Sequence, residues 1–107
     1  MIKGVKYTFA NGEELVVPPL SLGALEILQD KIGAFQGGVS KESIETIVEV
    51  TLAALHRNYP EITADQVKND LLDVSNMLDV FGLVMDIGGL KRKEIEAGEP
   101  KPEPVTA

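Results

Sequence analysis

Apolar and polar residues alternate at the start of the chain, on both sides of a turn signal. The alternation runs through residues 5–17 and is centred on Asn11-Gly12, two residues that tolerate positive φ. Pro18-Pro19 follows, and proline cannot donate a strand hydrogen bond. The pattern therefore predicts a β-hairpin within residues 3–17.

The length of the hairpin loop decides which side chains share a face. A two-residue loop, Asn11-Gly12, puts the apolar residues of the two strands on opposite faces. A three-residue loop that begins at Ala10, with Gly12 left-handed, pairs Tyr7 with Leu15 and Val5 with Val17. We predict the three-residue loop, because it gathers the apolar side chains on one face.

Helical spacing of apolar residues follows, and each helix begins at a capping residue. Ser21 is the expected N-cap of a helix over about residues 21–35, and Ser40 that of a helix over about 41–57. Thr63, with Gln66 three residues later, matches a capping box and predicts a helix over about 64–72.

The segment 74–90 is apolar on nearly every side, which is typical of a buried helix. We predict this helix over about residues 74–88. The segment spans about 25 Å, less than the roughly 30 Å of a bilayer's hydrocarbon core, and Asp79 and Asp86 interrupt it. We therefore expect no membrane insertion.

Residues 91–107 are rich in Pro, Glu and Lys and show no apolar periodicity, which predicts a flexible, charged tail. The predicted fold is thus α+β, mainly α. An N-terminal β-hairpin is followed by three to four packed helices in one small domain, residues 1–90, and by a disordered C-terminal tail.

Charge narrows the range of partners. The 107 residues include ten basic and seventeen acidic side chains, a net charge of −7, and no cysteine. The negative field should repel phosphate backbones and anionic membrane surfaces, so we expect neither nucleic acid nor a membrane as a partner. The start of the chain lacks the apolar segment of a signal peptide, and we expect a cytoplasmic protein.

Few residues suggest catalysis or metal binding. His56 is the only histidine, and at the end of its predicted helix it suits an interaction with the last carbonyl groups. The aspartates do not follow the spacing of a calcium-binding loop. We predict no catalytic residue, no metal site and no cofactor, hence no enzyme.

The apolar excess of the last predicted helix is the most informative functional feature. Such a helix is either the centre of the core or half-exposed, with one face left for a partner helix or a second copy. Its two aspartates share a face, where they either border a partner groove or simply form the one solvated stripe. The candidate partner-binding residues are Met77, Asp79, Val80, Phe81, Val84, Met85 and Asp86.

Three segments of the sequence resemble a known family. They read VKYTFANGEELVVPPLSLGALEIL, TLAALHRNYPEITADQV and NMLDVFGLVMDIGGLKR, and the similarity is greatest around Arg57, Asn58, Tyr59 and Pro60. Over about residues 5–92 the chain resembles the tail assembly chaperones of long-tailed bacteriophages and their prophage relatives.

The resemblance implies a non-catalytic holdase of the host bacterial cytoplasm that is absent from the mature virion. It would bind the tape measure protein and help recruit tail tube subunits. In this hypothesis exposed Met77, Phe81 and Met85 cover amphipathic segments of the client, and self-association as a homo-oligomer coats it. The alternatives are a virion structural subunit, such as a tail completion or connector protein, and a small acidic regulator of a basic partner.

Overall fold

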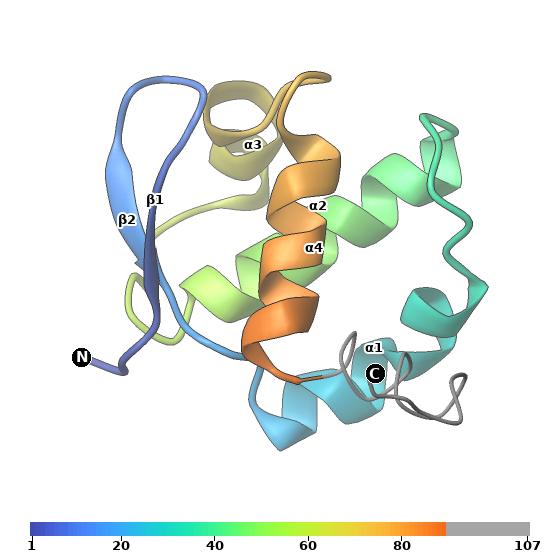
Figure 1. Cartoon of the computed structure of the whole chain (residues 1–107), viewed down its shortest axis with the longest axis horizontal. Helices are drawn as coiled ribbons and strands as arrows, with labels where there is room; N and C mark the ends of the chain where they lie inside the picture. The colour runs from blue at the N-terminus through green and yellow to red at the C-terminus, as the bar shows by residue number, and fades with distance from the viewer. Residues whose placement is uncertain (90–107) are drawn as a thin grey trace, which may run out of the picture.

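The chain folds into an N-terminal hairpin and a set of short helices, as the computed structural model in Figure 1 shows. The structure describes residues 1–89, and the predicted tail over residues 91–107 lies outside them. The arrangement confirms the predicted α+β, mainly α fold.

The hairpin has the predicted three-residue loop. Strands β1 (Val5–Thr8) and β2 (Glu14–Val17) are antiparallel, with Val5 opposite Val17 and Tyr7 opposite Leu15. The loop closes where Phe9 N donates to Glu13 O at 2.9 Å, and Gly12 has a φ of 88°. Glycine adopts this left-handed conformation without steric cost, so the predicted register is confirmed.

Helices α1 (Leu22–Ala34) and α2 (Lys41–Leu55) begin immediately after the two predicted N-caps. Ser21 Oγ accepts from Ala24 N at 3.1 Å, and Ser40 Oγ accepts from Ser43 N at 3.2 Å. The end of α2 comes two residues before the predicted one. The amides of Arg57 and Asn58 bond to carbonyls three residues back, those of Ala54 and Leu55, so the α-helical pattern stops.

The predicted third helix is irregular. Thr63 and Gln66 form the predicted capping box at the start of α3 (Ala64–Gln66). The chain then continues as a π-helical turn, η1 (Val67–Leu71), closed by Leu72 N donating to Val67 O at 3.0 Å. In this wider turn the Leu71 carbonyl accepts from Ala10 N of the hairpin loop at 2.9 Å.

Helix α4 (Met77–Ile87) begins three residues after the predicted start at residue 74. Asp73 is the reason, because its carboxylate holds residues 73–76 in a turn. Its Oδ1 accepts from Ser75 N at 2.9 Å and from Asn76 N at 3.2 Å. Side-chain hydrogen bonds of this kind compete with helix formation at the positions they cover.

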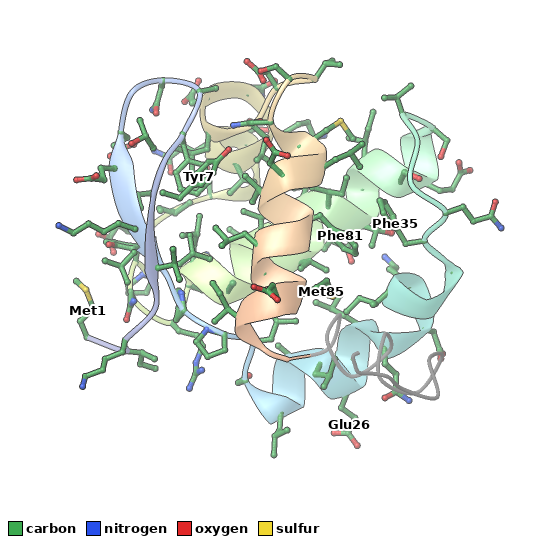
Figure 2. All side chains as sticks on the ribbon, viewed as in Figure 1. Met1, Tyr7, Glu26, Phe35, Phe81 and Met85 are labelled. Atoms are coloured by element: carbon green, nitrogen blue, oxygen red, sulfur yellow. The ribbon has the colours of Figure 1, made fainter. Side chains whose placement is uncertain are left out.

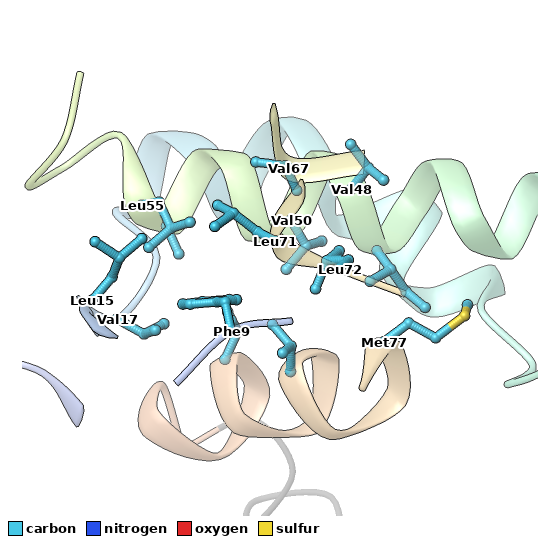
Figure 3. Packing of buried hydrophobic residues seen from close by; sticks show 14 of the residues in the cluster. Phe9, Leu15, Val17, Val48, Val50, Leu55, Val67, Leu71, Leu72 and Met77 are labelled. Carbon is cyan, nitrogen blue, oxygen red and sulfur yellow. The ribbon is translucent and has the colours of Figure 1, made fainter. Parts of the chain in front are cut away.

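The core lies where α4 crosses α2, and the hairpin fills one end of it (Figure 1, Figure 3). Strand β2, helices α1, α2 and α4 and the turn η1 contribute buried apolar side chains, together with Phe9 of the hairpin loop and Leu72 after η1. They are Phe9, Leu15, Val17, Leu28, Ile47, Val48, Val50, Ala54, Leu55, Val67, Leu71, Leu72, Met77, Val80, Val84 and Met85. Within residues 1–89 no helix combines the length and apolar character needed to cross a membrane.

Candidate partner-binding surface

Most of the residues predicted to meet a partner on α4 belong to the core instead. Met77 and Met85 are only 6% and 7% exposed, and Val80 and Val84 are fully buried. The expectation that these four side chains are accessible to a partner is therefore wrong. The physical reason is that the apolar side of α4 faces α2 across the core, with hairpin side chains such as Phe9 at one end, so its apolar excess is used in folding.

Three predicted residues of α4 remain accessible to different degrees. Asp79 and Asp86 are exposed and form the solvated side of the helix, as their spacing suggested. Phe81 is half-buried, and its ring packs on that of Phe35 with centroids 4.2 Å apart and planes inclined by 36°. Figure 2 shows Phe35 and Phe81 side by side. This contact attaches the end of α1 to α4.

The motif that carries the family resemblance binds the protein's own hairpin. Tyr59 Oη accepts from Val16 N at 2.9 Å, and Arg57 Nη1 donates to Pro19 O at 2.9 Å. Val16 N points away from β1, so Tyr59 satisfies an amide on the outer edge of the sheet. Pro60 is exposed just after this contact. These residues therefore have an architectural role in the fold.

Asn58 uses both the oxygen and the nitrogen of its side-chain amide to bond to the backbone of Ile2. Its Oδ1 accepts from Ile2 N at 2.6 Å, and its Nδ2 donates to Ile2 O at 2.9 Å. The side-chain amide thus pairs with the backbone as a neighbouring strand would. Gly4 follows closely, and a Cβ there would overlap the carbonyl of Val17, so only glycine allows this approach.

The histidine and the partly buried Tyr7 have surroundings that the fold explains. His56 Nε2 donates to Ile62 O at 2.6 Å, so this histidine bonds to the next loop and not to the last carbonyls of its own helix. Burial, followed by the negative charges of Asp79 and Asp73, raises the pKa of Tyr7. Within residues 1–89, no three His, Asp or Glu side chains come together as metal ligands.

Helix α1 carries two large apolar side chains that are strongly exposed. Leu22 and Ile27 are 84% and 81% exposed, and Leu28 alone is buried in this helix. At about 100° per residue, Glu26 and Asp30 lie between those two apolar side chains on the outer surface. We call Leu22, Glu26, Ile27 and Asp30 the α1 patch. Glu26 projects away from the body of the molecule in Figure 2.

The spacing of apolar residues in α1 indicates that some of them are exposed. The apolar residues of α1 are Leu22, Leu25, Ile27, Leu28 and Ile32, and they do not fit on one side of a helix. Ile27 lies about 140° from Leu22, with two acids in the interval. A helix with apolar residues on both sides of an acidic stripe cannot bury all of them against one neighbour.

An open pocket lies beside this patch, between the end of α1 and the start of α2. Its volume is about 400 Å³. We call it the α1–α2 pocket; its lining residues are Lys31, Ala34, Phe35, Gln36, Ser40, Glu42, Ser43, Glu45 and Thr46. Lys31 is paired with Glu49 across the two helices, with 2.8 Å between Nζ and Oε2.

Comparison of the chain with protein-family models, with curated proteins and with solved structures gives no match in any of the three. The functional argument therefore rests on the residues and surfaces described above.

Proposed function

We propose that this chain is a non-catalytic chaperone that holds a long helical client protein through the α1 patch. The observation that carries the proposal is the exposure of Leu22 and Ile27, two large aliphatic side chains on one short helix. Burying such a side chain fully stabilises a complex by roughly 1.5–3 kcal/mol. The two residues can therefore supply a substantial part of a binding free energy.

The charge of the molecule suits a holdase. Residues 91–107 have four basic and four acidic side chains, so the net charge of −7 belongs to the preceding part of the chain. Mutual repulsion at this charge opposes association of the free chaperone through its apolar residues. Glu26 and Asp30, inside the patch, also favour a client segment that is both apolar and basic.

The resemblance to phage tail assembly chaperones supplies the biological setting of the proposal. Under this proposal the client is the tape measure protein, and the complex forms in the host bacterial cytoplasm. Tail tube subunits are then recruited around the tape measure protein. The chaperone leaves before the virion is complete. With most of α4 buried, the client-binding role moves from α4 to α1.

Co-expression with the tape measure protein of the same phage tests the proposal. The wild-type chain should keep the client in the supernatant, and L22Q/I27Q should reduce the soluble client at least about tenfold, since two apolar contacts are lost. Both positions are exposed, so circular dichroism should show an unchanged helical content. V39Q/V74Q removes two exposed apolar side chains elsewhere and should keep the wild-type effect.

Three outcomes would contradict the proposal. A folded L22Q/I27Q variant that still keeps the client in the supernatant would exclude the α1 patch. Detection of the chain by mass spectrometry in purified particles would instead favour a virion structural subunit. A complex that dissociates fully at high salt would favour an acidic regulator of a basic partner, because apolar contacts are not screened.

A further inference from the structure

We propose that the α1–α2 pocket receives an arginine or lysine side chain from the helical segment that the α1 patch binds. This inference rests on the proposed function and adds the chemical class of client segment that is recognised. The pocket adjoins the patch at Ile27, because Ile27, Lys31 and Ala34 are spaced by four and three residues and share a side of α1. Ala34 and Lys31 line the pocket.

The polar groups at the base of the pocket already have partners. Ser40 Oγ bonds to Ser43 Oγ at 3.1 Å, and Thr46 Oγ1 donates to Glu42 O at 3.0 Å. Lys31, the only cationic residue among those lining the pocket, is neutralised by Glu49. These groups are therefore satisfied before any partner arrives.

Unlike the polar groups with partners, the carboxylates of Glu42 and Glu45 are available to bind a cation. Both residues are exposed, both line the pocket, and neither carboxylate has an ion pair or hydrogen bond within residues 1–89. Phe35 supplies an apolar wall between the two helices. A long side chain with an apolar stem and a cationic end matches this combination, because the stem packs on the ring while the charge meets the carboxylates.

The charge of the lining disfavours an anionic occupant. A volume of about 400 Å³ accommodates a long side chain, and it is at the low end for pockets that bind small molecules. The start of a helix generally favours anions. Here Ser40 already caps α2 and Glu42 lies in its first turn, so an additional anion would meet two carboxylates.

Two designed peptides test this inference. Each is an amphipathic helix of about 18 residues, five turns, with a leucine stripe; one has arginine beside the stripe and the other has glutamine at the same positions. Fluorescence anisotropy measures their affinities for the full chain. The wild-type chain should bind the arginine peptide about three- to tenfold more tightly. E42Q/E45Q should remove this preference, whereas E13Q/E14Q, the matched change on the hairpin, should retain it.

The outcomes separate this inference from the proposed function. Equal binding of both peptides by the wild-type chain, or loss of the preference in E13Q/E14Q, overturns the pocket inference while the α1 patch stands. Failure of both peptides to bind overturns both. Glu42 lies in the first turn of α2, so E45Q alone, outside that turn, is the second variant if the double variant is unstable. It should reduce the preference, and an unchanged preference would count against the pocket.

Discussion

Thr51 is a fully buried threonine in the middle of α2, and its hydroxyl has no hydrogen-bond partner within residues 1–89. A buried polar group without a partner costs about 1–3 kcal/mol. Thr46, five residues earlier, differs in this respect, because its hydroxyl donates to Glu42 O at 3.0 Å. The same residue type on one helix is thus satisfied at one position and not at the other.

We predict that Thr51→Val raises the free energy of unfolding by about 1–2 kcal/mol, because valine has nearly the same shape and nothing to desolvate. In a domain of this size that change corresponds to a rise in Tm of roughly 4–8 °C per kcal/mol. Urea unfolding followed by circular dichroism measures it. The matched Thr46→Val should be neutral or destabilising, and a Thr51→Val variant less stable than the wild type would contradict the prediction.

At the scale of elements, the features that could be predicted from the sequence are those that depend on residues close together in the chain. Ser21, Ser40 and the Thr63 capping box act within four residues, and the hairpin register follows from a loop of three. The π-helical turn η1 was not predicted, because the Leu71 carbonyl bonds to Ala10, 61 positions earlier in the chain. A hydrogen bond between residues so far apart cannot be predicted from the apolar and polar pattern of the neighbouring residues.

The turn before α4 depends on an ionised carboxylate. The Ser75 hydroxyl donates to Asp73 Oδ1 at 2.6 Å and is the main cause that lowers the pKa of Asp73 below 3.8; the Ser75 and Asn76 amides add to it. Near pH 3.8 the folded state therefore binds fewer protons than the unfolded state. This contribution to stability is present above about pH 3.8 and is lost as pH falls through the lower pKa of the folded chain.

We predict that the urea midpoint of the wild-type chain falls on acidification between about pH 5 and pH 2, and that Asp73→Asn makes this fall shallower. Asparagine keeps an oxygen that accepts from the same donors and removes the ionisation. Asp70→Asn removes an equal charge from the preceding turn and serves as the control. Identical pH profiles for the wild type and Asp73→Asn would show that the carboxylate does not couple folding to pH.

At the scale of the whole molecule, the candidate site could be predicted only in part. The sequence indicated an excess of apolar residues on the last helix and exposed aspartates beside them; the aspartates are exposed, but most of the apolar residues of that helix are buried. The packing of the elements decides which helix buries its apolar residues: α4 packs on α2, and the hairpin closes one end of the core between them, whereas α1 buries Leu28 alone. Leu22 is therefore exposed and Met85 is not. Periodicity within one helix cannot decide this competition between helices.

Hydrogen bonds from the segment after α2 attach the start of the chain and the hairpin to the helices. Asn58 joins residues 56 positions apart through two hydrogen bonds to Ile2, next to the contact between Tyr59 and Val16. An isolated two-stranded hairpin is only marginally stable, so contacts outside the ladder must hold it on the helices. Arg57, Asn58 and Tyr59 provide them, which explains why this segment has the residue types it has without invoking a partner.

We predict that Asn58→Ala lowers the free energy of unfolding by about 1–2 kcal/mol, because it removes both hydrogen bonds and leaves the partly buried Ile2 amide without its partner. Amide hydrogen exchange should be faster in β1 and β2 than in α2, since the hairpin detaches before the helices unfold. Asn69→Ala, at an exposed asparagine whose side chain makes no hydrogen bond within residues 1–89, should leave both quantities unchanged. If Asn58→Ala instead accelerated exchange equally in all elements, the hairpin and the helices would form one cooperative unit, and the attachment would not be a local one.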